Sequence, residues 1–194
     1  MTPDLQPLRD LLQGFFADFL DLVEPGLRER ERLETVAFLD PCCLADWPEH
    51  ERRRLGLVAD MRASGGRRLT FLVQIEPQAG HRRALEKRLL RYYLWLLVGR
   101  RKPVRMVVVF LEGGRPGVRA EAIVERQGDR EVMRVPYTTF GLQGCLAEDY
   151  LRRPEPPAWA LAAFMRPGRM SPVELKLACL RRIAEARRCP STAG

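Results

Sequence analysis

Clusters of basic residues are the features of this chain whose type and spacing point most directly to chemistry. They lie at 52–54, 67–68, 82–83 and 100–102, close to the boundaries of the elements that the sequence predicts. Lysine and arginine number 33 against 25 aspartates and glutamates, which gives a net charge of +8 at neutral pH. Such an excess of guanidinium and ammonium groups is typical of proteins that bind phosphates, so the sequence predicts a polyanionic partner. The alternative is a GC-rich genome, in which arginine replaces lysine at solvent-exposed positions without any role in binding.

Cysteine and histidine form no recognisable metal-binding pattern. The five cysteines include no Cys-x-x-Cys pair, and the chain has two histidines, His50 and His81. Zinc sites need closely spaced ligands of these types, so we expect no structural zinc ion. An odd number of cysteines also argues against a disulfide framework. Because no apolar run reaches about 20 residues and no export signal is visible, we expect a cytoplasmic protein that does not cross a membrane.

Hydrophobic periodicity predicts the elements in the first part of the chain. Apolar residues at three- and four-residue steps predict a helix over 8–23, ended by a Pro-Gly pair. A short β-prone run follows at 35–39. Two longer strands, 55–62 and 69–76, are joined through a Ser-Gly-Gly sequence whose glycines can adopt positive φ. We therefore expect these two strands to pair in antiparallel fashion.

A helix and a buried strand complete the predicted core. Residues 82–98 have the periodicity of an amphipathic helix, and 104–111 is an unbroken apolar run typical of a strand buried on both faces. A helix that joins two such strands predicts a βαβ crossover and hence parallel pairing. Two weaker strands are predicted over 118–125 and 131–135. The sequence thus predicts an α/β fold with a mixed sheet.

The last part of the chain is predicted to be helical. A helix is expected over 158–165, and the Ser-Pro-Val-Glu sequence at 171–174 is a capping box that begins another. We therefore predict a core over 1–140, a helical extension over 141–189 packed on it, and a frayed tail over 190–194.

Short motifs in a fixed order carry a resemblance to a known family. The predicted order, αβββαβ, is that of the PD-(D/E)XK phosphodiesterases. The chain resembles, over about residues 8–187, the Rpn-type recombination-promoting nucleases and transposases of that superfamily. The most specific motif is Glu-x-Gln at the end of a strand, followed ten residues later by Arg-x-x-Arg-Tyr-Tyr. The motifs are Phe38-Leu39-Asp40-Pro41, Leu57-Val58-Ala59, Val73-Gln74-Ile75-Glu76-Pro77-Gln78, Arg88-Leu89-Leu90-Arg91-Tyr92-Tyr93 and Lys102-Pro103-Val104.

This resemblance implies magnesium-dependent hydrolysis of DNA. Carboxylate-bound Mg²⁺ polarises the phosphate and lowers the pKa of the attacking water. The family pattern makes Glu76 a metal ligand, lets Pro77 offer its carbonyl, and places Gln78 where other branches carry lysine. The residues that we expect to contact the DNA backbone are Arg53, Arg82, Arg83, Arg88 and Arg91.

The chain departs from the family pattern at its first metal ligand. The family has an aspartate just before the Leu-Val-Ala motif, and this chain has Gly56. Asp60 lies four residues further along the same strand, roughly 13 Å away, which is too far for one magnesium ion to bridge. Asp40, Glu34 or another carboxylate from a helix would have to complete the site. We also expect Gly56→Asp to restore the missing ligand without a large rearrangement.

Two functions therefore stay open. One is a magnesium-dependent endonuclease, and the other is a degenerate relative that binds DNA or another protein through the same surface. Glu76 and Gln78 also fit the polar end of an edge strand. Tyr92 and Tyr93 could stack on bases, although aromatic residues at helical spacing are more typical of a core. The sequence does not decide between a monomer and a homodimer.

Overall fold

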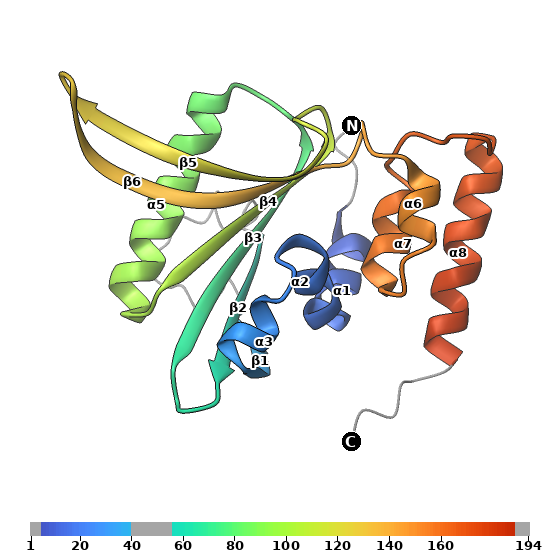
Figure 1. Cartoon of the computed structure of the whole chain (residues 1–194), viewed down its shortest axis with the longest axis horizontal. Helices are drawn as coiled ribbons and strands as arrows, with labels where there is room; N and C mark the ends of the chain where they lie inside the picture. Colours follow the sequence, from blue (N-terminus) through green and yellow to red (C-terminus); the bar gives the residue numbers. More distant parts are fainter. Residues whose placement is uncertain (1–4, 40–55, 189–194) are drawn as a thin grey trace.

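An open mixed sheet organises the computed structural model, which describes residues 5–39 and 56–188 (Figure 1). Six strands in these residues run in the order β1-β2-β3-β4-β6-β5. Strands β1, β2 and β3 pair antiparallel, β4 is parallel to both β3 and β6, and β5 pairs antiparallel with β6. The predicted α/β class, the antiparallel hairpin and the parallel crossover are confirmed. The strands are β1 (Leu33–Phe38), β2 (Leu57–Ala63), β3 (Arg68–Gln78), β4 (Val104–Glu112), β5 (Gly117–Gln127) and β6 (Arg130–Gly141).

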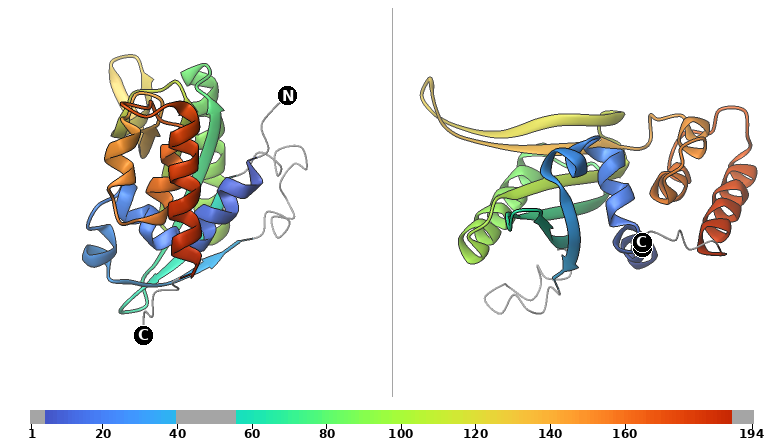
Figure 2. Two further views of the ribbon diagram at one scale, coloured as in Figure 1. Left: turned by 90° about the vertical axis from the view of Figure 1, so that its right-hand side faces the viewer. Right: turned by 60° about the horizontal axis from the view of Figure 1, so that its bottom comes forward.

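Helices cover both faces of this sheet. The long helix α5 packs on one face, where Leu72 of β3 and Val108 of β4 lie beneath it. Helices α1, α2 and α7 pack on the other face, and α8 packs on α7 (Figures 1 and 2). Among the described helices, none is long and apolar enough to cross a membrane. The helices are α1 (Gln6–Gly14), α2 (Phe16–Val23), α3 (Leu27–Glu31), α5 (Arg82–Arg100), α6 (Ala147–Leu151), α7 (Pro156–Ala162) and α8 (Pro172–Arg188).

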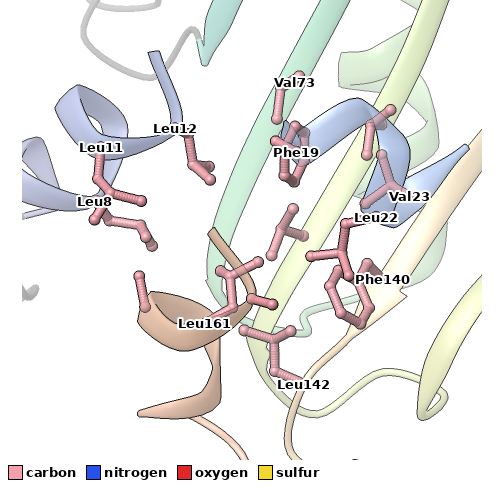
Figure 3. Packing of buried hydrophobic residues seen from close by; sticks show 14 of the residues in the cluster. Leu8, Leu11, Leu12, Phe19, Leu22, Val23, Val73, Phe140, Leu142 and Leu161 are labelled. Carbon is pink, nitrogen blue, oxygen red and sulfur yellow. The ribbon is translucent and has the colours of Figure 1, made fainter. Parts of the chain in front are cut away.

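The central strand β3 explains why the core has two halves. Its residues 69–75 are all buried, because β3 lies between two strands and beneath helices on both sides. Side chains alternate along a strand, so Val73 points to one hydrophobic cluster and Leu72 to the other. Figure 3 shows Val73 next to Phe19 of α2, with Leu161 of α7 in the same cluster. Residues of the predicted core (1–140) and of the predicted helical extension (141–189) thus share one hydrophobic cluster.

The predicted helix over 8–23 is wrong in one respect. The backbone leaves helical geometry at Phe15, with φ of −123° and ψ of 39°, and this divides the segment into α1 and α2. Helix α1 then contacts α7, while Phe16 at the start of α2 packs edge to face against Phe71 of β3. Because of this break, the apolar residues of α1 and α2 can pack in different directions, α1 against α7 and α2 against β3. The charged stretch that follows forms α3, which the sequence did not predict.

Strands β5 and β6 are longer than predicted because they form a two-stranded arm. Only Thr138–Gly141 of β6 pairs with β4, so the rest of β6 pairs with β5 alone. The arm extends across α5, and its buried side chains Ile123, Val135 and Tyr137 join the cluster under that helix (Figure 1). Packing on α5 therefore replaces the missing strand neighbour.

Two local predictions are confirmed in detail. Gly65 and Gly66 have φ of 89° and 83° in the β2–β3 turn. The capping box begins α8, since the backbone N–H of Ser171 donates to Glu174 at 2.7 Å and that of Glu174 to the Ser171 hydroxyl at 3.3 Å. Helix α7 begins at Pro156, two residues before its predicted start, and the short helix α6 was not predicted. The predicted tail at 190–194 lies outside the described residues.

Candidate functional site

An ion pair joins the end of β3 to helix α5. Nη2 of Arg88 donates to Oε1 of Glu76, and the two side chains are 25% and 16% exposed. Glu76 lies on the α5-facing side of β3, one alternation beyond buried Gln74. The carboxylate that the family pattern assigns to a metal therefore already has a cation against it.

The neighbours of Glu76 are less enclosed. Pro77 is half-buried and Gln78 is exposed, next to Glu112 of β4 in the strand register. Strand β3 is central in the sheet, so the interpretation of Glu76 and Gln78 as the end of an edge strand is wrong. Tyr92 is fully buried in the cluster beneath α5, which confirms its assignment to the core.

Gly56 lies against the backbone of β3, and this overturns the expected Gly56→Asp rescue. The Gly56 N–H donates to Oε1 of Gln74 at 3.1 Å, in a buried position. A Cβ atom at residue 56 would lie 1.7 Å from the carbonyl oxygen of Val73. The close approach of two backbones requires glycine here, so position 56 cannot carry a carboxylate without moving the chain.

The structure does not bring Asp60 to Glu76. Asp60 pairs with Thr70 in the strand register, six residues from Glu76 and roughly 20 Å away along β3. It accepts hydrogen bonds from Thr70 Oγ1 at 2.7 Å and from Lys102 Nζ at 2.6 Å. Burial raises the pKa of this carboxyl, but the bonds from Lys102 and Thr70 outweigh burial and leave the pKa below its ordinary value. Asp60 is thus one member of an ion pair at the opposite end of the strand.

These positions do not fit a magnesium site at Glu76. The Glu76 carboxylate is paired with Arg88, residue 56 has no room for a side chain, and Asp60 is out of reach. Within 5–39 and 56–188, no three His, Cys, Asp or Glu side chains gather in a way that could hold a metal ion. The alternative ligand Asp40 lies outside the described residues, as does the candidate DNA contact Arg53.

The remaining candidate DNA contacts divide into two groups on α5. Arg82 bonds Glu86 at 2.6 Å and Glu121 at 3.1 Å, and Arg88 is bound to Glu76. Arg83 and Arg91 are exposed on the face of α5 that points away from the sheet.

Lys87 lies between Arg83 and Arg91 and was not among the predicted contacts. It is exposed and lies four residues from each arginine, so the three cations form one row along α5. The four-residue spacing is visible in the sequence and could have identified Lys87. Each four-residue step rises about 6 Å, so the row extends over roughly 12 Å.

Comparison with known proteins gives no relative. No protein-family model matches the chain, and neither a curated protein nor a solved structure is detectably similar to it.

Proposed function

We propose that this chain binds nucleic acid without cleaving it, as a degenerate relative of the PD-(D/E)XK nucleases. The observation that carries the proposal is the row of exposed cations Arg83, Lys87 and Arg91 on α5. Their helical positions place them together on one exposed face of α5. The kinship is supported by the strand arrangement, in which three antiparallel strands precede a helix and a parallel strand.

The dimensions of the row suit a phosphate backbone. Duplex DNA carries one negative charge for about 1.7 Å of helix axis, so cations spaced about 6 Å apart can each meet a phosphate. Such contacts position the duplex without reading its sequence. We therefore expect binding to duplex DNA with little sequence preference.

Absence of cleavage follows from the surroundings of Glu76. Phosphodiester hydrolysis by this superfamily uses a cation that carboxylates hold, and Arg88 already neutralises Glu76. Because Gly56 cannot be replaced by an acid without a clash, the chain has no room for the usual second ligand at that position. In this proposal the Glu76–Arg88 pair fixes α5 on β3 and so holds the cation row in place.

The test is fluorescence anisotropy with a labelled duplex over a range of salt concentrations. Three phosphate contacts predict that log K falls with log salt with a slope of about −3, or more steeply if other basic residues take part. Replacing Arg83, Lys87 and Arg91 by glutamine should reduce the steepness by about 3. A matched control replaces three exposed arginines outside the basic clusters, Arg62, Arg119 and Arg126, and removes the same charge.

Three results would contradict parts of this proposal. A parent protein that does not bind DNA at low salt excludes nucleic acid as the partner. Equal loss of affinity in both triple variants shows that α5 is not the contact surface. Nicking of supercoiled DNA in magnesium that disappears in Glu76→Ala shows that the chain is a nuclease after all.

A further inference from the structure

Helix α8 carries a second apolar stripe that faces solvent. Val173, Leu177 and Leu180 are 68%, 48% and 63% exposed, and Ala184 is also exposed. These residues follow one another at steps of four, three and four, so they line a single face of the helix. Large apolar side chains gathered on one exposed face mark an interaction site more often than a random surface.

The packing of α8 on the rest of the protein does not use this stripe. Leu175 and Cys179 are buried in the core cluster that contains α7, and the guanidinium of Arg182 lies 5.5 Å above the ring of Trp159. At 100° per residue these positions lie on the opposite side of the helix from Leu177 and Leu180. Figure 2 shows α8 as the outermost of the described elements on this side of the molecule.

We propose that the outward stripe of α8 binds the same stripe of a second copy of this chain, with the two helices antiparallel. Steps of four, three and four are the spacing of the a and d positions in a coiled-coil seam, which two helices bury between them. In the antiparallel register Leu177 lies opposite the partner's Leu180, and Val173 lies opposite the partner's Ala184. Two large residues fill the centre of the seam and smaller residues lie at its ends.

Charges beside the stripe select the antiparallel direction. In that register Glu174 lies beside the partner's Arg181, and symmetry repeats this attractive pair. In the parallel register Lys176 would lie beside the partner's Arg181, and symmetry would repeat this repulsion. Opposite charges at the edge of an interface favour one register over another, so the second copy fits best head to tail along the helix.

The size of the stripe sets the strength that we expect. It spans eleven residue steps, roughly 16 Å of helix, which makes an interface smaller than the standard of about 800 Å² per partner. A dissociation constant in the micromolar range is therefore expected. This association does not depend on the proposed binding of nucleic acid.

Sedimentation equilibrium of the full chain tests the association. The parent should change from monomer to dimer between low micromolar and several hundred micromolar concentration, while Leu177→Gln with Leu180→Gln should stay monomeric throughout. A matched control, Leu94→Gln with Val98→Gln, replaces two apolar residues of α5 that are 44% and 74% exposed and should dimerise like the parent. A monomeric parent, or equal dimerisation of all three proteins, overturns the proposal.

Disulfide trapping tests the direction, in a chain whose Cys42, Cys43 and Cys189 are replaced by serine. Val173→Cys with Ala184→Cys should form a covalent dimer on oxidation, because these positions are opposite each other across the seam. Val173→Cys alone should not, since its copy lies roughly 16 Å away along the antiparallel pair, beyond the 7 Å limit for a disulfide. Rapid trapping through Val173→Cys alone would overturn the antiparallel arrangement.

Discussion

Replacing Gly56 by alanine tests the packing of β2 on β3 directly. The added methyl group would lie 1.7 Å from the Val73 carbonyl oxygen, whereas ordinary contacts begin at 3.4 Å. The chain must therefore open by about 1.7 Å at the start of β2, the difference between these two distances. That movement also breaks the buried hydrogen bond from Gly56 to Gln74.

The expected loss of stability is large for so small a side chain. Overpacking of a well-packed site costs about 1–3 kcal/mol. The buried Gly56 N–H, left without this partner, costs about 1–3 kcal/mol more. The sum, about 2–6 kcal/mol, lowers the melting temperature of a chain of this size by roughly 4–24 °C, at about 2–4 °C for each kcal/mol.

Thermal and urea unfolding followed by circular dichroism measure this loss. The matched control is Gly99→Ala in α5, where nothing lies within 4 Å of the added atom and alanine should stabilise the helix by about 0.5–1 kcal/mol. Gly56→Asp should be at least as unstable as Gly56→Ala, and magnesium should not restore it. A Gly56→Ala variant within about 0.5 kcal/mol of the parent would refute the close backbone approach, since that is the usual effect of a neutral surface change.

Three further predictions concern local features. Gly65→Val with Gly66→Val should cost about 1–2 kcal/mol per residue, because both positions have positive φ, and an unchanged melting temperature would contradict this. Asp60→Asn should destabilise the protein at neutral pH. The folded pKa of Asp60 lies below its ordinary value of 3.8. The stabilisation by its carboxylate is therefore present above pH 3.8 and is lost as the pH falls through the folded pKa. The free energies of urea unfolding of parent and variant should thus converge in acid. Glu148→Ala should speed amide hydrogen exchange at Gly168 and Arg169, whose N–H groups bond the Glu148 carboxylate at 3.0 and 2.7 Å, and unchanged exchange there would show that these bonds protect nothing.

The Asp60–Lys102 pair shows how the structure distributes its charges. Lys102 follows α5 in the chain, yet its ammonium reaches the second strand of the sheet and binds Asp60 at 2.6 Å. Arg105 of β4 similarly bonds Glu24 beyond the end of α2 at 3.0 Å. Several of the basic residues thus form ion pairs between distant segments. The net charge therefore overstates the number of cations available to a polyanion.

Local sequence was sufficient for the elements whose signal lies within a few neighbouring residues. The apolar run of β4, the helical periodicity of α5, the glycines of the β2–β3 turn and the capping box of α8 all formed where the pattern predicted. Each depends on φ preferences, side-chain periodicity or a hydrogen bond over three residues. Such interactions are nearly independent of the rest of the chain.

The candidate site depended on contacts that no local pattern contains. The sequence predicted Glu76 as a metal ligand, but in the fold α5 places Arg88 against it. The sequence also predicted that Gly56 could be replaced by aspartate, but β3 places the Val73 carbonyl where that side chain would lie. The exposed stripe of α8 likewise became distinguishable from its buried stripe only when α7 covered one of them. Composition and spacing determined that this chain forms an α/β fold with a positive net charge. Strand register and helix placement decided which charges are paired and which faces stay open, because those contacts join residues far apart in sequence.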